Sequence, residues 1–380
     1  MARIDRFEME RMQSLYWHLV DYDLSESGVS PLSIAELLEG TDLGDAATFA
    51  QTKLGYPLSE GSELTRERIA QWYPGATHAN VTVVNGGSEA NFLSLFTLLG
   101  RGDRLAFEVP NYLQGPGLGR FFGDGTDTFR LKLRGGRWGL DVDELERSVG
   151  KTTTVIMVCN PNNPTGAVMT DEEMDAVVRV AERRGAWIVA DEIYRGTEVE
   201  GDEPSPSFWG RSERVVVTSG LSKAFGLPGL RIGWAVGPEA FIHDLWERHD
   251  YTTLTPGMAS DILCGAAMEP SKRAAIFDRT RGIVRSQLPR MEEWIHTHDD
   301  IFRYARPTAG AIAYVKYRLP MSSTKLVDRI REEQSVLLVG GDQFGLGKGL
   351  RFGFGFDIEY TMKGLARVDE TLAAVAKKSR

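Results

Sequence analysis

Short apolar runs alternate with helix-type segments between residues 81 and 237, and this alternation restricts the chain to few folds. The runs are VTVV (81–84), RLAFEV (104–109), TTVIMV (153–158), WIVAD (187–191), VVVTS (215–219) and LRIGWAVG (230–237). Such runs are typical of strands buried on both faces, as in parallel sheets covered by helices. Thr170 and Glu173 form a capping-box pair, which predicts a helix through Arg184. We therefore predict an α/β fold with a mostly parallel, mixed sheet.

The pattern changes beyond about residue 285. There AIAYVKY (311–317), a helical stretch near 322–334, VLLVG (336–340) and LRFGFG (350–355) indicate a smaller α+β domain. Towards the N-terminus, helices are predicted at residues 6–20, 34–38 and 61–72, the last opened by Ser62. We expect a large domain over residues 41–285 and a small domain over residues 286–380. Residues 1–40 are expected to pack with the small domain.

Charge and cysteine content exclude several classes of protein. Acidic residues outnumber basic ones by 53 to 44, so a general attraction to nucleic acid or to an anionic membrane is not expected. Cys159 and Cys264 are the two cysteines, which leaves no disulfide scaffold and no zinc-type CxxC pair, and we expect no metal site. No apolar stretch reaches the ~18 residues of a membrane helix, and the first residues lack a signal-peptide pattern. A cytoplasmic enzyme acting on small molecules is expected.

Lys223 is the first candidate catalytic residue. It lies in SGLSKAFGLPGLRIGW (219–234), directly after a predicted strand and among small or apolar neighbours. A partly desolvated lysine has a lowered pKa and can form a Schiff base with an aldehyde. Eight residues later, Arg231 is predicted to open a strand and to bind a phosphate through its guanidinium. The alternative for Lys223 is an ordinary structural salt bridge.

Two more candidates follow predicted strands. Asp191 ends WIVAD, Tyr194 follows in DEIYR, and ligands of open α/β sheets bind beyond the carboxyl ends of strands. A buried carboxylate there needs a cation, and a protonated pyridine nitrogen would serve. In NPNNPTG (160–166), the prolines fix the backbone and leave Asn163 to present its side-chain amide. The alternatives are a capping aspartate and a plain connecting turn.

Taken together, NPNNPTG, DEIYR and SGLSKAFGLPGLRIGW resemble the class I and II aminotransferase family of fold-type I pyridoxal-phosphate (PLP) enzymes. The resemblance covers residues 22 to 375. It implies a large PLP-binding domain with a smaller α+β domain, PLP as cofactor, and an amino acid and a 2-oxo acid as substrates. It also implies a homodimer.

The resemblance assigns the chemistry at the ring to four residues. Lys223 would hold PLP as an imine and, once substrate displaces it, carry a proton between the substrate and the cofactor. Asp191 would keep the pyridine nitrogen protonated, so that the ring accepts electrons. Tyr194 and Asn163 would hydrogen-bond the phenolic oxygen and keep the pKa of the imine low.

Phosphate contacts are implied at two places in the chain. A helix start after a strand suits an anion, because its backbone N–H groups have no helical partner. The resemblance implies contacts from Gly87, Ser88 and Glu89 at this helix start. It implies further phosphate contacts from Ser222 and Arg231. Gly220 departs from the family pattern, which often has a serine three residues before the lysine. Either Ser219 compensates or the phosphate has one contact fewer.

The remaining implied contacts concern the ring face, the second subunit and the substrate. Tyr112 would stack on the pyridine ring, and Tyr56 would reach the phosphate in the neighbouring subunit of the homodimer. Arg351 would bind the substrate carboxylate through a two-pronged contact. Asn163 and Gly28 are further candidates for substrate binding.

The resemblance favours transamination by a ping-pong mechanism, but one alternative stays open. LSESGVSPLSIAELL (24–38) also resembles the subgroup that contains capreomycidine synthase, a PLP enzyme that eliminates and cyclises a hydroxylated arginine. That reading makes the protein a lyase or cyclase for an arginine-like amino acid. We further hypothesise that Glu26 or Asp23 faces the substrate side chain and favours a cationic amino acid.

Overall fold

A mixed sheet of eight strands forms the centre of the computed structural model, which describes residues 4–377. The order across the sheet is β2 (Val81–Val84), β9 (Gly233–Val236), β8 (Val215–Gly220), β7 (Trp187–Asp191), β6 (Thr153–Cys159), β3 (Arg104–Val109), β4 (Thr126–Arg134) and β5 (Arg137–Leu140). The strands from β8 to β4 pair in parallel, whereas β2, β9 and β5 run antiparallel to their neighbours. The predicted α/β fold is confirmed.

Helices cover both faces of this sheet. One face packs on α4 (Glu63–Ala70), α7 (Val142–Ser148), α8 (Asp171–Arg184), α10 (Met258–Met268) and the first part of α11 (Pro270–His296). The other face packs on α5 (Gly87–Leu98), α6 (Gln114–Phe122) and α9 (Glu239–His249). Along β7, Ile188 and Ala190 enter the first core and Val189 enters the second. Burial on both faces explains the continuous apolar runs of the sequence.

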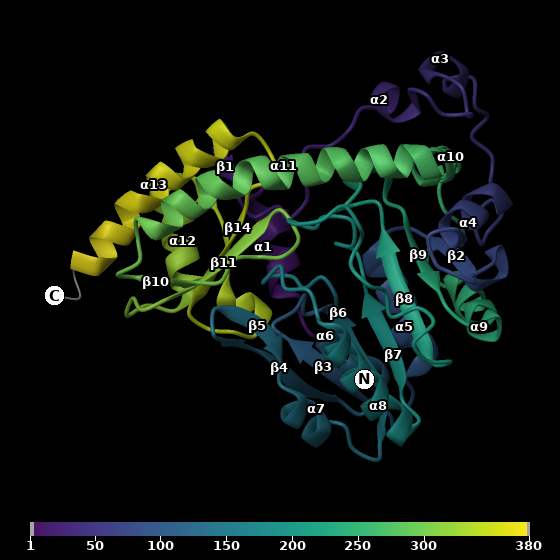
Figure 1. Ribbon diagram of the computed structural model, residues 1–380, viewed down its shortest axis with the longest axis horizontal. Helices are drawn as coiled ribbons and strands as arrows, with labels where there is room; N and C mark the ends of the chain where they lie inside the picture. Colours follow the sequence, from purple (N-terminus) through teal and green to yellow (C-terminus); the bar gives the residue numbers. More distant parts are fainter. Residues whose placement is uncertain (1–3, 378–380) are drawn as a thin grey trace.

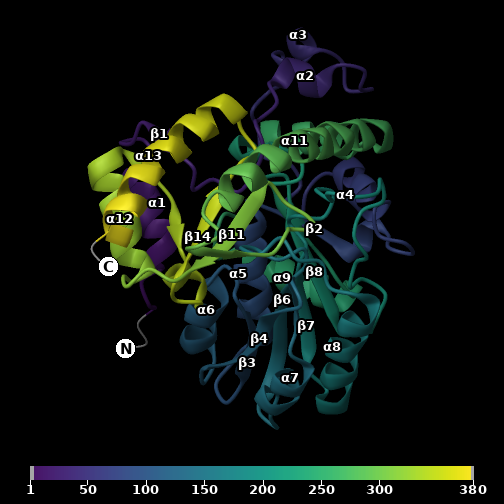
Figure 2. The ribbon, with the colours of Figure 1, turned by 60° about the vertical axis from the view of Figure 1, so that its left-hand side comes forward.

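A smaller sheet lies beside the large one. Its order is β10 (Phe302–Tyr304), β11 (Ile312–Tyr317), β14 (Gly349–Gly353) and β13 (Val339–Gly340), and it is accompanied by α12 (Ser323–Gln334), η3 (Gly341–Phe344) and α13 (Ile358–Lys377). The N-terminal segment joins this part, because β1 (Tyr22–Asp23) pairs with β12 (Val336–Leu337). Leu24 and Val29 also pack into the core of the smaller sheet. In Figure 2, α1 (Glu8–Tyr16) lies close to α12 and β14.

Helix α11 links the two parts of the molecule. It runs from α10 and the large sheet towards α13 and the small sheet (Figure 1). Ile276 and Phe277 belong to the core of the large sheet, whereas Val284 and Leu288 belong to that of the small sheet. The predicted boundary at residue 285 therefore falls inside one continuous helix. The division into residues 1–40, 41–285 and 286–380 stays a prediction.

Most predicted elements are present with similar bounds. The N-terminal helices are α1, α2 (Ile34–Leu38) and α4, and Ser62 caps α4 as predicted. Thr170 and Glu173 form the predicted capping box at the start of α8. The short helices α2 and α3 (Ala46–Phe49) project from the rest of the chain in both ribbon views (Figures 1 and 2). Between α4 and β2 lies η1 (His78–Asn80).

Two features differ from the prediction. Arg231 does not open a strand: Pro228–Leu230 form the short helix η2, Arg231 has a φ of 50°, and β9 begins only at Gly233. The hairpin of β4 and β5 was not predicted, because its strands are partly exposed and carry many charged residues. No helix within residues 4–377 is long and apolar enough to cross a membrane. A cytoplasmic location stays a prediction.

Gly233 allows β9 to approach the start of α5. A Cβ atom on Gly233 would lie 2.3 Å from the carbonyl carbon of Gly86 and 2.4 Å from the nitrogen of Gly87. Both are backbone atoms, so neither can rotate away. We predict that Gly233→Ala lowers the free energy of unfolding by about 3 kcal/mol, since overpacking forces the backbone to move.

The matched control is Gly282→Ala, because Gly282 is exposed on α11 and a Cβ there meets no atom within 4 Å. This variant is expected to gain about 0.8 kcal/mol from helix propensity. Urea unfolding of both variants checks the prediction. Equal stability of Gly233→Ala and the parent would contradict it.

Candidate active site

A cavity of about 590 Å³ opens beyond the carboxyl ends of β3, β6, β7 and β8. Because these strands are parallel, the residues that follow them meet at one edge of the sheet. The cavity collects most of the residues that the sequence predicted. Its lining includes Glu26, Gly87, Ser88, Tyr112, Asn163, Asp191, Tyr194, Ser222, Lys223, Arg231 and Arg351.

Lys223 forms an ion pair inside the cavity. Its Nζ donates a hydrogen bond to Oε1 of Glu26 at 2.6 Å, and the two side chains are 23% and 26% exposed. Burial opposes both charges. Even so, Lys223 and the amides of Ser27 and Gly28 lower the pKa of Glu26 to about 2. Burial also favours a neutral amine, but Glu26 and Tyr194 raise the pKa of Lys223 above its ordinary value. The lowered pKa predicted for Lys223 is therefore wrong for the protein without a ligand, because Glu26 supplies a counter-charge.

Asp191 presents a carboxylate that has no cationic partner among the described residues. Its Oδ2 accepts from Nδ2 of Asn91 at 2.8 Å, and its Oδ1 accepts from the amide of Ile193 at 3.1 Å. Thr218 in turn donates to Oδ1 of Asn91 at 2.6 Å and fixes the orientation of this amide. Burial raises the pKa of Asp191, although these hydrogen bonds oppose the shift. A cationic ring nitrogen in the cavity would complete this arrangement.

Arg351, on β14 of the smaller sheet, meets Asn163, which follows β6 of the large sheet. Nη1 of Arg351 donates to Oδ1 of Asn163 at 2.8 Å, and Nη2 donates to the carbonyl of Ser25. Arg351 is 2% exposed, and its buried Nε has no hydrogen-bond partner among the described residues. The Tyr194 hydroxyl is also buried and lies 2.8 Å from Oγ of Ser27. Asn163 and Ser25 thus hold the Arg351 guanidinium in place at the cavity.

A cradle for an anion forms at the start of α5. Gly86 has a φ of 106°, and a Cβ there would lie 2.5 Å from Nη2 of Arg231, so a side chain would displace this guanidinium. Arg231 also donates to Oγ of Ser222 at 3.5 Å. The described residues make no hydrogen bond to the amides of Gly87 and Ser88. These groups suit a phosphate.

Two residues that were expected to bind the phosphate do not face this cradle. The Glu89 carboxylate accepts from the amide of Asn85 and from Thr253, and its own amide is bonded to the Gly86 carbonyl. Oγ of Ser219 donates to the carbonyl of Glu192 at 3.3 Å instead of reaching the cavity. Compensation by Ser219 is therefore not observed.

Helix α1 covers one side of the cavity, and the sequence did not predict this. Glu10 accepts a hydrogen bond from the Tyr112 hydroxyl at 2.7 Å, and Phe7 packs edge-on against the same ring at 4.7 Å between centroids. Burial and Glu10 together raise the pKa of Tyr112 well above its usual value. Asn91 and Cys159 are further lining residues that sequence reasoning missed. For Asn91, the available signal was a polar residue on the apolar face of α5.

Besides Glu89 and Ser219, three more predicted residues lie outside the lining. Gly28 sits just behind it, where a Cβ would lie 3.3 Å from Oε1 of Glu26 and 3.8 Å from Cδ of Lys223. Asp23 does not face a substrate: its Oδ1 accepts from the amide and the hydroxyl of Ser25. Tyr56 is 83% exposed, and it does not line the cavity of its own chain.

The cavity fits PLP group by group. It offers an amine for the aldehyde, a buried carboxylate for the pyridine nitrogen, and two backbone amides with a guanidinium for the phosphate. Such a combination defines a PLP-dependent enzyme of the aminotransferase type.

Comparison with known proteins agrees with this class. Residues 27–368 match the family model for aminotransferase class I and II. Capreomycidine synthase from Streptomyces vinaceus is 28% identical over 366 residues, which cover 94% of this chain and 91% of the relative. A PLP-dependent aminotransferase from Streptococcus suis superimposes with a TM-score of 0.89 at 28% identity, covering 98% and 99% of the two chains. The PLP-dependent cyclase OrfR gives a TM-score of 0.85 at 27% identity over 98% of each chain. The chain belongs to the aminotransferase class I and II family, and this membership implies PLP as its cofactor.

The ion pair of Lys223 and Glu26 predicts a pH dependence. Glu26→Gln should lower the stability of the cofactor-free protein by about 2 kcal/mol at pH 7, because the Lys223 ammonium loses a charged partner. The folded-state pKa of Glu26 is lowered from 4.5 to about 2, so its contribution is full above the unfolded pKa. This contribution disappears as the pH falls from 4.5 towards 2.

Urea unfolding between pH 3 and pH 7 tests this prediction. We expect the gap between parent and variant to narrow below about pH 4.5. Glu182→Gln, at an exposed carboxylate on α8, is the control and should show little change. A gap that stays constant across this range would contradict the ion pair.

Proposed function

We propose that the protein is a PLP-dependent aminotransferase that moves an amino group between an L-amino acid and a 2-oxo acid in a ping-pong cycle. One observation carries the proposal: among the described residues, Lys223 is the only lysine that lines the cavity, and it lies with Tyr194, Asn163 and Arg351 around the same space. Transamination needs one group that carries a proton next to the cofactor, and a lysine in this position is sufficient.

Bound PLP would supply an electron sink that stabilises negative charge on the substrate α-carbon. Lys223 would hold the aldehyde carbon and, once released, would take the α-proton and return it to the cofactor. Asp191 would keep a proton on the ring nitrogen, because Asn91 holds its carboxylate in place. Tyr194 and Asn163 would donate hydrogen bonds to the phenolic oxygen. Tyr112 would cover one face of the ring.

The substrate end of the cavity is proposed to lie near Arg351. Its guanidinium would bind the α-carboxylate, because Arg351 lines the cavity and is a cation that can form paired hydrogen bonds with a carboxylate. Asn163 holds this side chain through Nη1, so Arg351 is aligned before substrate arrives. Gly28, directly behind Glu26, would let the N-terminal segment approach the substrate closely.

A lyase or cyclase acting on a hydroxylated, arginine-like amino acid is the second candidate. It is favoured by the likeness to capreomycidine synthase and by the position of the Glu26 carboxylate. Once Lys223 is joined to the cofactor, Glu26 would be free to pair with a cationic substrate side chain. Comparing arginine and ornithine turnover in Glu26→Gln and the parent tests this role, and an unchanged preference would exclude it.

An amino-acid screen separates the two candidates. The purified PLP-bound protein is mixed with the standard amino acids, ornithine and hydroxyarginine, without any 2-oxo acid. We expect one class of amino acid to convert the bound cofactor to its amine form and to release one equivalent of 2-oxo acid. This follows because a ping-pong enzyme stops after its first half-reaction when no acceptor is present. Absorbance spectra and assays for 2-oxo acid and ammonia provide the measurement.

Continuous release of ammonia, water or a cyclised product, with the PLP spectrum retained, would favour the lyase or cyclase instead. Absence of both a spectral change and any released product, with every amino acid, would contradict both candidates.

We also propose that the active unit is a homodimer in which Tyr56 reaches the phosphate of the neighbouring subunit. Tyr56 is 83% exposed, and its neighbours Leu54 and Leu58 are 80% and 58% exposed. Exposed apolar side chains clustered on one segment are typical of an interaction surface.

Hybrid dimers test the role of Tyr56. Lys223→Ala and Tyr56→Ala should each reduce activity strongly, whereas co-expression of the two should restore it in hybrids. Activity returns because one site of each hybrid then has both an intact Lys223 and an intact Tyr56. Differently tagged subunits allow the hybrids to be purified and assayed.

The matched control is co-expression of the single variants Lys223→Ala and Asp191→Ala. Both lesions lie in a subunit's own site, so no hybrid site is complete and activity should stay low. Failure of the Tyr56→Ala hybrids to exceed this control would contradict a shared site.

A further inference from the structure

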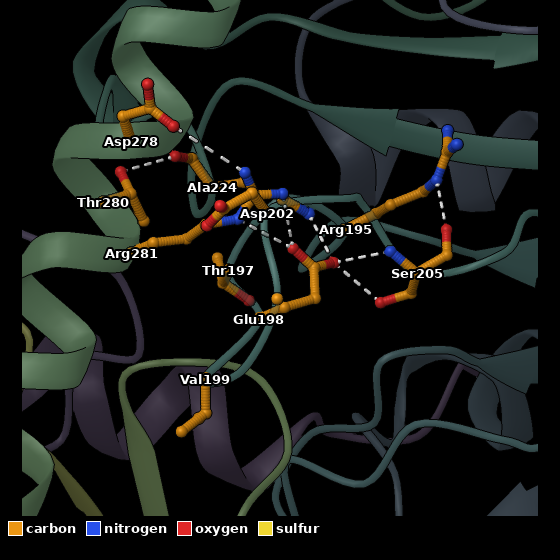
Figure 3. A network of polar contacts seen from close by, with 12 residues as sticks. Arg195, Thr197, Glu198, Val199, Asp202, Ser205, Ala224, Asp278, Thr280 and Arg281 are labelled. Atoms are coloured by element: carbon orange, nitrogen blue, oxygen red, sulfur yellow. Dashed lines mark hydrogen bonds and ion pairs between the residues drawn. The ribbon is translucent and has the colours of Figure 1, made fainter.

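Helix α11 is bonded to both segments that carry the catalytic groups of the large sheet. Figure 3 shows Glu198, in the loop after β7, bonded to Ser205 of the same loop and to Arg281 of α11, and Thr280 of α11 bonded to Ala224. We call Glu198, Ser205, Thr280 and Arg281 the α11 clamp. The loop after β7 contains Tyr194, and the carbonyl bound by Thr280 belongs to Ala224, the residue after Lys223.

The charged half of the clamp is buried. Nη2 and Nε of Arg281 donate to Oε2 of Glu198 at 3.0 and 3.3 Å, and the two side chains are 4% and 8% exposed. Oε1 of Glu198 accepts from the amides of Gly196 and Ser205 at 2.9 and 2.8 Å and from the Ser205 hydroxyl at 2.7 Å. Glu198 therefore joins two parts of this loop, at Gly196 and Ser205, and attaches the loop to α11.

The loop approaches α11 closely at Gly196. This residue has a φ of 104°, and a Cβ there would lie 2.6 Å from the ring of Phe277. The hydroxyl of Thr197 donates to the Tyr194 carbonyl at 2.5 Å, while it accepts from the amide of Gly310 at 2.9 Å. A shift of α11 relative to this loop would thus displace the backbone of Tyr194.

The neutral half of the clamp holds the other catalytic segment. Oγ1 of Thr280 donates to the Ala224 carbonyl at 2.9 Å, and both residues are buried. Arg279, one residue earlier, donates to the Ser30 carbonyl at 2.8 Å in the N-terminal segment that carries Glu26. Consecutive residues of one helix therefore reach three of the segments that face the cavity, those of Glu26, Tyr194 and Lys223.

We propose that Thr280 and Arg281 are positioning residues, which hold the backbone segments of Lys223 and Tyr194 at a fixed separation at the cofactor site. Neither side chain lines the cavity, so each acts through the segment it binds. The proposal rests on the role proposed for Lys223. Catalytic rates are sensitive to such placement, because a displacement of about 1 Å can reduce a rate by about 100-fold.

Thr280→Val tests the proposal, since it removes the hydroxyl at nearly constant volume. We expect PLP to dissociate about fivefold more readily, the equivalent of one lost hydrogen bond. The pH midpoint of the visible absorbance of bound PLP should rise, because a shifted Lys223 segment moves the cofactor away from the Tyr194 hydroxyl, which then no longer stabilises the deprotonated form. We further expect kcat to fall more than KM rises, with both the midpoint and kcat recovered in Thr280→Ser.

Thr65→Val is the matched control. Thr65 is also buried, and its hydroxyl donates to the carbonyl of Asp261 at 3.0 Å. Neither residue lines the cavity. It should lose stability like Thr280→Val but keep the parent's absorbance midpoint and kcat. Arg281→Lys, which keeps the charge but not the fork, should shift the midpoint in the same direction as Thr280→Val.

The outcomes separate the inference from the function on which it rests. If the parent forms no lysine-bound PLP, or Lys223→Ala retains its spectrum, the role of Lys223 and this inference both fail. If the parent binds PLP at Lys223 and Thr280→Val differs from it only in stability, as Thr65→Val does, the positioning role is wrong.

Discussion

The ion pair of Lys223 with Glu26 is the interaction on which the site depends. It joins a loop of the large sheet to the N-terminal segment, which packs with the smaller sheet. An isolated charge in such a cavity would be costly, so each group requires the other as long as no ligand is bound. In the proposed function, a ligand that takes up the Lys223 amine would release the Glu26 carboxylate towards the substrate space. One carboxylate would then link cofactor binding to substrate selection.

The parallel strands explain why the remaining groups meet. Asp191, Lys223, Asn163 and Tyr112 each follow a strand that ends at the same edge of the sheet. The fold therefore places cationic and anionic side chains together in one cavity. The Arg231 guanidinium lies against Gly86 at the start of α5, amides of Asn91 and Ile193 hold the Asp191 carboxylate, and Arg351 lines the opposite part of the site with Asn163. In the proposed function, each group would contact a different part of PLP or of an amino-acid substrate.

The sequence predicted groups that lie within contiguous motifs and missed those that depend on distant contacts. DEIYR and SGLSKAF identify Asp191 and Lys223 because the strand and the functional group are adjacent in the chain. The pKa of Lys223 was predicted in the wrong direction because its counter-charge is 197 residues away. Glu10 and Thr280 were missed for the same reason, since nothing near them in the sequence shows what they face. Arg231 was placed on a strand because the η2 turn interrupts an otherwise apolar run.

The central claim is that Lys223 carries the cofactor. The most direct measurement is reduction of the PLP-bound protein with borohydride, followed by proteolysis and mass mapping of the modified peptide. The account predicts a single phosphopyridoxyl group, on Lys223. Modification at another lysine, or no stable modification after reduction, would contradict it.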